Sequence, residues 1–287
     1  MRIGFIGLGA MGLPMARNLL QGGFEVAGFD QRAEAVNSLA EAGGIAAKSS
    51  ADAARKCDVL ILMVVNAAQA ESILFSDGAL EATKSGACVM LMATCPPQAV
   101  ENIEARVSAA GRGFLDSPVS GGVVGAKAAT LSIMFSGDPA TVECTRPVLD
   151  ALGDKLFHIG DRPGQGAMAK TINQLLCGVH VAAAAEAMSL AEKAGVPTDI
   201  MLEIVSGSAA SSWMLRDRGE RMLQENPQVT SAVDIFVKDL GIVMAAGTST
   251  RAALPIAAAA HQMFLAASGQ GRGAEDDSKV IEAYRRL

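Results

Sequence analysis

The stretch GQGAMAKTINQLLCGVHVAAAAEAMSLAEKA, residues 164–194, separates two parts of the chain that differ in character. Pro163 precedes it and Pro197 follows shortly after it, and no proline lies within it. Because proline marks helix boundaries, this spacing predicts one long helix. At 1.5 Å per residue the helix would be about 45 Å long, which is enough to leave one domain and enter another.

The middle of this predicted helix is almost wholly apolar. Between residues 175 and 191 only His180 and Glu186 interrupt a run of apolar and small residues, and Lys193 follows closely. A helix without a polar face is typically buried nearly all round. The uncharged run is too short for a membrane span, so we expect a core or subunit-contact helix and no membrane partner.

Composition narrows the class of protein. With 287 residues, half of them hydrophobic, the chain can form two ordinary domains. A net charge of −6 and the lack of a basic cluster make nucleic acid an unlikely partner. The N-terminal residues enter an apolar strand without a cleavable signal, which predicts a cytoplasmic enzyme. The cysteines are odd in number and scattered without CxxC spacing, which predicts free thiols and no metal site. They are Cys57, Cys88, Cys95, Cys144 and Cys177.

The N-terminal residues predict a dinucleotide-binding turn. An apolar run at 2–6 leads into Gly7-Leu8-Gly9-Ala10-Met11-Gly12, and helical spacing follows at 13–20. In a strand, glycine turn and helix of this kind, the first glycine makes the turn and the second admits a pyrophosphate. The third lets the helix pack on the strand, and the helix start supplies free N–H groups.

Asp30 follows the predicted second strand, 25–29, and lies 18 residues after Gly12. An acid at this place can accept both ribose hydroxyls of the adenosine and repels a 2′-phosphate, which favours NAD over NADP. A plain turn role for Asp30 is the alternative. Arg32, two residues on, leaves NADP open because it could hold a phosphate.

The alternation of strands and helices continues. Continuous apolar runs at 59–65 and 88–92 are typical of strands covered on both faces, and 99–110 has helical character. The pattern predicts a doubly wound parallel sheet. Ligands of such sheets bind beyond the carboxyl ends of the strands. The connecting residues there are ordinary loops or cofactor contacts, and the candidates are Val64, Val65, Gln69 and Thr94.

A second glycine turn follows at 114–122, FLDSPVSGG. The amides of Ser120, Gly121 and Gly122 could hold a carboxylate, although a plain loop would look the same. Two final strands, 130–135 and 156–159, then surround a helix at 140–152. We expect the first domain to span 1–162 and the long helix 163–194.

After Pro197 the strand signal disappears. Helical segments at 199–205, 212–223, 233–246, 255–267 and 278–286 predict an all-α domain over 195–287. Trp213 is expected in its core. Lys238 and Asp239 interrupt an apolar pattern, either as a salt-bridged helix face or as a site. The predicted fold class is therefore α/β, an N-terminal Rossmann doubly wound sheet joined by a long helix to an all-α C-terminal domain.

Four motifs in this order resemble the β-hydroxyacid dehydrogenase family, the relatives of 3-hydroxyisobutyrate dehydrogenase and tartronate semialdehyde reductase. They are GFIGLGAMGLPMARNL at 4–19, DSPVSGG at 116–122, GQGAMAKTINQ at 164–174 and FVKDLG at 236–241. VVNAAQ at 64–69 and EDDS at 275–278 narrow the resemblance to members that oxidise L-threonate.

The resemblance implies roles for individual residues. Lys170 matches the catalytic lysine, Thr94 a threonine beside the nicotinamide, and Lys238 a lysine that reaches cofactor and substrate, oriented by Asp239. The substrate carboxylate is assigned to Ser120, Gly121 and Gly122. The family usually has Asn four residues after the lysine, but here that position is Gln174, preceded by Asn173, so either amide could bind substrate.

The implied reaction is NAD-dependent oxidation of a small hydroxy acid, with L-threonate to 2-dehydro-L-erythronate as the leading case. Lys170 can accept the hydroxyl proton only if its amine is partly neutral, which an apolar helix, Lys238 and the positive NAD ring would each favour. The alternatives are a 3-hydroxyisobutyrate dehydrogenase, or a reductase of tartronate semialdehyde, succinic semialdehyde or glyoxylate. A non-catalytic dinucleotide-binding assembly module is the alternative of another class. The apolar helix predicts a homo-oligomer, a dimer or a tetramer.

Overall fold

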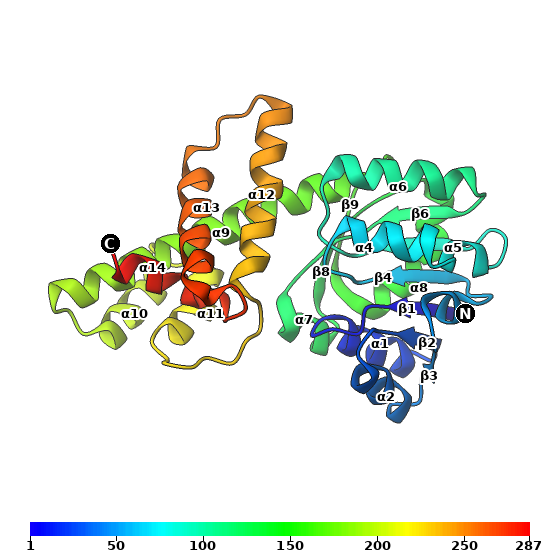
Figure 1. The fold of residues 1–287 in the computed structure, drawn as a ribbon, viewed down its shortest axis with the longest axis horizontal. Coiled ribbons are helices and arrows are strands. Elements are labelled where there is room, and N and C mark those ends of the chain that lie inside the picture. Colours follow the sequence, from blue (N-terminus) through cyan, green and yellow to red (C-terminus); the bar gives the residue numbers. More distant parts are fainter. The chain divides into compact units, whose positions relative to one another are not determined.

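The computed structural model describes residues 1–287 and has the predicted architecture. The chain divides into two compact units, Met1–Lys170 and Thr171–Leu287. The division falls inside the long helix α9 (Gln165–Ala194), which ends at the predicted residue and begins two residues after the predicted start of 163. The first unit contains the Rossmann-like sheet and the second is helical (Figure 1).

The first unit is built on a nine-stranded sheet in the order β3-β2-β1-β4-β5-β6-β8-β7, with β9 paired to β8. The six strands from β3 to β6 in this order are parallel. Their bounds are β1 (Arg2–Ile6), β2 (Glu25–Phe29), β3 (Ile45–Ala46), β4 (Val59–Leu62), β5 (Cys88–Leu91) and β6 (Gly113–Asp116).

Helices cover both faces of this sheet because successive strand residues point to opposite sides. In β1, Ile3 and Phe5 join a core with α1, α2, α7 and α8, whereas Ile6 joins a core with α3, α4, α5 and α6. Figure 1 shows α4, α5 and α6 on one side of the strands and α1, α2 and α7 on the other. Their bounds are α1 (Gly12–Gln21), α2 (Ala33–Glu41), α3 (Ser50–Ala54), α4 (Ala67–Glu71), α5 (Ala79–Ala82), α6 (Pro97–Ala109), α7 (Gly122–Ala128) and α8 (Pro139–Leu152), with a π-helical turn at Ser72–Ser76.

One edge of the sheet departs from the wholly parallel prediction. β8 (Leu131–Ser136) runs antiparallel to β6 and to β7 (Val119–Ser120), and β9 (Gly153–Gly160) runs parallel to β8. Parallel neighbours need a long crossover, whereas antiparallel strands can be joined by short connections. After β6 the chain continues in the same direction through β7, and the seven-residue helix α7 then reverses it into β8, which is therefore antiparallel to both strands.

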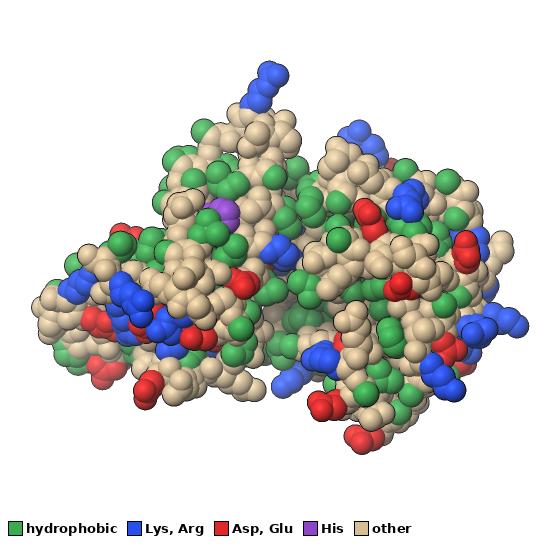
Figure 2. Space-filling view, in the orientation of Figure 1, with side chains coloured by type: hydrophobic (Ala, Val, Ile, Leu, Met, Phe, Trp, Pro, Cys, Tyr) green, Lys and Arg blue, Asp and Glu red, His purple; other side chains and the backbone are tan.

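The second unit packs the rest of α9 with the helices predicted after Pro197. They are α10 (Thr198–Ser206), α11 (Trp213–Met222), α12 (Val233–Thr250), α13 (Pro255–Ala267) and α14 (Ile281–Arg285), with short turns η2 (Ser268–Arg272) and η3 (Asp277–Val280). Their apolar faces form one core, in which the rings of Phe236 and Phe264 stack at 4.9 Å. Charged side chains gather over α11 and α14 (Figure 2). Buried ion pairs there include Arg218 with Asp277 at 2.9 Å.

The structure shows how far two burial predictions hold. Along α9, which we expected to be a core or subunit-contact helix, one stripe faces the core of its unit, and Ile172, Leu176 and Leu190 on the opposite stripe are at least half exposed in the single chain. The prediction for Trp213 is wrong. Trp213 begins α11 and is also half exposed rather than in the core. By length and composition α9 would suit a membrane span, but half of its most apolar window is buried inside the protein.

Candidate active site

The glycine turn after β1 has the geometry of a dinucleotide cradle. Gly7 has φ +97°, and a Cβ there would lie 2.3 Å from the carbonyl oxygen of Met63. A Cβ at Gly12 would lie 1.8 Å from the carbonyl oxygen of Gly7, so α1 packs directly on the turn. At Gly9 the nearest atom would be 3.8 Å away, in Arg32. The turn is thus closed at its ends and open in its middle, and no side chain caps α1, as a bound diphosphate requires.

Asp30 adjoins this turn. Its Oδ2 accepts a hydrogen bond from the Leu8 amide at 2.8 Å, and its Oδ1 accepts from the backbone N and the Nε of Arg32 at 2.9 and 3.0 Å. Burial raises the pKa of Asp30, but the hydrogen bonds from Arg32 and Leu8 outweigh it and lower the pKa overall. The ionised carboxylate of Asp30 therefore lies beside the glycine turn, and Arg32 is hydrogen-bonded to it.

The loop after β4 lies at the same edge of the sheet, because β4 pairs in parallel with β1. Asn66 caps α4 by accepting from the Gln69 amide at 2.9 Å, and Gln69 Oε1 accepts from the Val65 amide at 2.9 Å. The side chain of Gln69 therefore shapes the loop that contains Val64 and Val65. Asn66 lies in the loop that we expected to border the cofactor, but its capping role was not predicted, although Asn followed three residues later by Gln is a recognisable capping pattern.

Thr94 and the Ser-Gly-Gly turn also follow strands that end at this edge. Thr94 comes three residues after β5, which is parallel to β4. β7 runs in the same direction as β6, because both are antiparallel to β8, so Ser120 ends at this edge as well. Gly121 and Gly122 have φ of +126° and +60°, a conformation that favours glycine.

Helix α9 begins against the carboxyl end of β6. Asp116, the last residue of β6, accepts hydrogen bonds at its Oδ2 from the amides of Gly164 and Ala167 at 3.0 and 2.7 Å. Lys170 lies one turn further along α9 and is 6% exposed. The structure therefore brings Lys170 into the same unit and to the same strand ends as the predicted cofactor residues. Asp116 itself was quoted only as part of a motif.

The remaining predicted substrate residues meet within the second unit. Gln174 Nε2 donates to Asp239 Oδ2 at 2.6 Å, and Lys238 Nζ forms an ion pair with Asp239 Oδ1 at 2.9 Å. Asn173 instead accepts from the Cys177 thiol at 3.8 Å. Gln174 is thus joined directly to the Lys238–Asp239 pair. Both Gln174 and Asp239 are buried.

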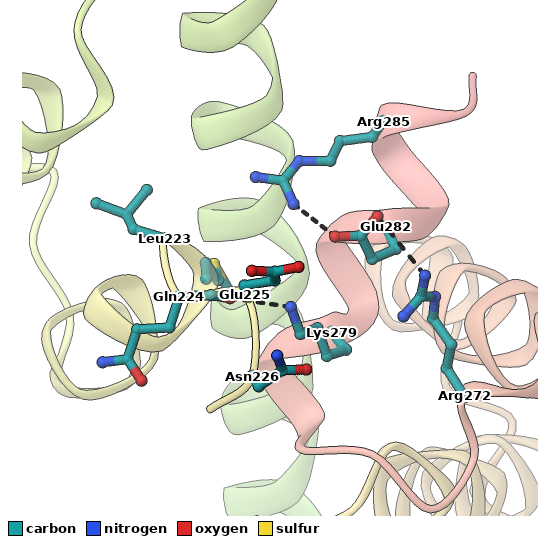
Figure 3. Close-up of a pocket in the computed structure, with 9 residues that line it drawn as sticks. Leu223, Gln224, Glu225, Asn226, Arg272, Lys279, Glu282 and Arg285 are labelled. Atoms are coloured by element: carbon teal, nitrogen blue, oxygen red, sulfur yellow. Dashed lines mark hydrogen bonds and ion pairs between the residues drawn. The ribbon is translucent and has the colours of Figure 1, made fainter. Parts of the chain in front are cut away.

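A separate cavity of about 450 Å³ lies in the second unit and contains none of the predicted site residues. Arg272 and Arg285 both pair with Glu282 there, and the Lys279 ammonium donates to the carbonyl oxygen of Gln224 at 2.9 Å (Figure 3). Its arginines are neutralised by carboxylates of the same unit. The cavity is therefore not the candidate active site.

Comparison with known proteins defines the class. Residues 2–160 match the family described as the NAD binding domain of 6-phosphogluconate dehydrogenase, and residues 164–284 match the NAD-binding domain of NADP-dependent 3-hydroxyisobutyrate dehydrogenase. These two domains, with the glycine turn between β1 and α1, define an NAD(P)-binding hydroxyacid dehydrogenase.

Individual relatives cover nearly the whole chain. An L-threonate dehydrogenase of Cupriavidus necator is 44% identical over 98% of this chain and 95% of its own length. One from Escherichia coli K12 is 40% identical over 98% and 94%. The crystal structure of a 3-hydroxyisobutyrate dehydrogenase from Salmonella typhimurium is 42% identical, with a TM-score of 0.94 and coverage of 98% of this chain and 99% of that one. The chain belongs to the β-hydroxyacid dehydrogenase family, as its four motifs predicted.

A methyl group at Gly9 tests the cradle. Because the added Cβ has no neighbour nearer than 3.8 Å, we expect Gly9→Ala to fold normally. It should nevertheless weaken dinucleotide binding by about tenfold or more, since the backbone could no longer approach the diphosphate. Fluorescence titration with NADH measures this. Gly269→Ala, at another glycine with open surroundings, is the matched control and should leave the affinity unchanged. Equal affinities for both variants would place the diphosphate elsewhere.

Asp116 predicts a specific dependence of stability on pH. Burial raises its pKa to about 6, which the hydrogen bonds from Ala167 and Gly164 only partly offset. Between about pH 4 and about pH 6 the folded protein keeps a proton that the unfolded chain has lost, so this group's contribution to stability falls as pH rises and is constant above. Asp116→Asn should remove that fall, worth on the order of 3 kcal/mol. Urea denaturation across this range would contradict the assignment if both proteins gave parallel curves.

Proposed function

We propose that the protein oxidises L-threonate to 2-dehydro-L-erythronate with NAD. The observation that carries the reaction type is the buried Lys170 on the helix that begins at the carboxyl end of β6, in the unit that holds the dinucleotide cradle. The substrate rests on the names of relatives that are 40 to 44% identical over nearly the whole chain.

Each group has an assigned task. Bound NAD supplies the acceptor for the hydride that leaves the substrate carbon. Lys170 accepts the hydroxyl proton as general base, and in the reverse direction it returns that proton. We assign the substrate carboxylate to the turn Ser120–Gly121–Gly122, whose positive φ angles suit an anion-binding turn. In the second unit, the family resemblance assigns substrate binding to Gln174, Lys238 and Asp239, which are joined by one hydrogen bond and one ion pair.

The cofactor assignment to NAD rests on Asp30. Its carboxylate has a lowered pKa and is charged at neutral pH, so it would accept ribose hydroxyls and repel a 2′-phosphate. Arg32 is the residue that favours NADP. Its side chain donates to both oxygens of this carboxylate, from Nε at 3.0 Å and from Nη2 at 3.3 Å, and is thereby drawn away from a phosphate.

We further propose that the protein is a cytoplasmic homo-oligomer. The exposed stripe of Ile172, Leu176 and Leu190 on α9, together with Ile200 and Ile204 on α10, is an apolar surface of the kind that subunits bury. All five cysteines are free thiols, which fits a reducing compartment. A single-chain mass by light scattering at enzyme concentrations would contradict the oligomer.

The substrate is tested by absorbance at 340 nm with L-threonate, D-threonate, 3-hydroxyisobutyrate and D-glycerate, each with NAD and with NADP. We expect the highest kcat/KM for L-threonate with NAD. The name of the Salmonella relative supports 3-hydroxyisobutyrate as the second candidate. Preference for a semialdehyde or glyoxylate with NADPH would overturn both. No change in absorbance with any substrate of the panel, while NADH still binds, would favour a non-catalytic assembly module.

Replacing Lys170 tests the proton transfer. Lys170→Ala should lower kcat by about a hundredfold to ten-thousandfold, the usual contribution of positioned proton transfer, while NADH binding is retained. Lys193→Ala, in the last turn of the same helix, is the matched control and should keep normal kcat. Near-normal turnover in Lys170→Ala would remove this residue from the mechanism.

A further inference from the structure

The first amides of a helix have no acceptors within the helix itself, so their partners show what holds its start. In α9 every one of them is bonded. Gln165 N bonds to Arg162 O in the local chain at 3.3 Å, and the ordinary helical pattern begins with Met168 N, which bonds to Gly164 O at 2.9 Å. Two bond to side chains of the sheet, Gly166 N to Ser136 Oγ at 3.0 Å and Ala167 N to Asp116 Oδ2 at 2.7 Å.

These two side chains form a single buried unit. Asp116 ends β6 and Ser136 ends β8, and both are at most 1% exposed. Ser136 Oγ accepts from Gly166 and also donates to Asp116 Oδ2 at 3.3 Å. Asp116 Oδ2 further accepts from Gly164 at 3.0 Å, so it contacts the backbone just before the helix and inside its first turn. A carboxylate here also meets the positive end of the helix dipole.

The arrangement differs from an ordinary cap. In α8, Asp138 caps its own helix by accepting from Ala140 and Thr141, two and three residues away. Asp116 stands 48 and 51 residues from its backbone partners on α9. An ordinary cap fixes only the local turn, whereas Asp116 and Ser136 attach the start of α9 to two strands.

Close packing also restricts movement of the first turn of α9 against the sheet. A Cβ at Gly166 would lie 2.8 Å from the carbonyl oxygen of Met134 and 3.0 Å from that of Asp116, so the helix backbone rests against β6 and β8. Gly164, with φ +89°, makes the turn that leads into this contact. The first turn of α9 cannot slide or rotate without breaking these bonds.

Lys170 lies on this anchored part of the helix. It is three residues beyond Ala167 and four beyond Gly166, so it shares their face one turn further on. A displacement of the first turn is therefore passed on to the lysine. Misplacing a reacting group by about 1 Å can cost on the order of a hundredfold in rate.

We propose that Asp116 and Ser136 are positioning residues for Lys170. They attach the start of α9 to the carboxyl ends of β6 and β8, and thereby hold the amine where it transfers the proton. Neither residue touches the substrate. The inference rests on the proposed function, because it assumes that Lys170 is the general base.

The test compares Asp116→Asn, Ser136→Ala and the control Asp138→Asn, using the most active substrate and dinucleotide of the panel. Asp116→Asn and Ser136→Ala, which we call the clamp variants, should both lower kcat by about tenfold or more, with little change in the KM for the dinucleotide. The pH profile of kcat should also shift, because a displaced lysine titrates in different surroundings. Hydrogen–deuterium exchange should accelerate in the peptide that covers residues 164–170.

The control should change exchange only at the start of α8 and leave kcat within about twofold, because a lost local cap affects its own helix alone. If Asp116→Asn does not fold, Ser136→Ala decides the question, because it leaves the carboxylate in place. Normal kcat and a normal pH profile in the folded clamp variants would overturn the proposal. So would lower stability or faster exchange without any change in kcat.

Lys170→Ala, measured in the same series, separates the two levels of inference. If it retains turnover while exchange at residues 164–170 still accelerates in the clamp variants, the general-base assignment fails and with it the positioning role. If Lys170→Ala is inactive and the clamp variants are fully active, only the positioning role fails.

Discussion

The attachment of α9 to the sheet is the constraint on which the candidate active site depends. A charged carboxylate is costly to bury, and burial raises the pKa of Asp116 to about 6. Amides of Gly164 and Ala167 and the Ser136 hydroxyl offset part of that cost, while the same bonds satisfy a helix start that would otherwise lack acceptors. The same hydrogen bonds therefore stabilise the buried carboxylate of Asp116 and give acceptors to the first amides of α9. They lie at the end of β6, where the DSPVSGG motif begins.

The starts of α1 and α9, both in the first unit, differ in what bonds to their first amides. α1 begins without a side-chain cap behind an open glycine, so its amides are available to a dinucleotide diphosphate. α9 begins with its amides bonded to Asp116 and Ser136, so it offers nothing to an anion and instead presents Lys170. The unit can therefore bind the cofactor with one helix and supply the proposed base from another.

The predicted site residues of the second unit, Gln174, Lys238 and Asp239, form a polar cluster on α9 and α12, whereas those of the first unit lie mainly in glycine turns. Asp239 accepts from Gln174 and pairs with Lys238, so a change of any one of the three leaves a buried partner unsatisfied. α9 and α12 approach closely beside these residues, because a Cβ at Gly178 would lie 2.8 Å from the Leu240 side chain. Gln174, at the position where the family resemblance led us to expect Asn, is long enough to donate to Asp239 at 2.6 Å.

The sequence by itself determined the features that depend on neighbouring residues. The strand, glycine turn and helix at 1–21, the position of Asp30, the bounds of α9 and the helices after Pro197 all followed from local periodicity and from proline and glycine spacing. Only the tertiary structure decided that β8 runs antiparallel to β6, that one stripe of α9 is exposed, and that Asp116 bonds to residues 48 and 51 positions away. Such contacts join residues far apart in the chain, and no local pattern specifies them.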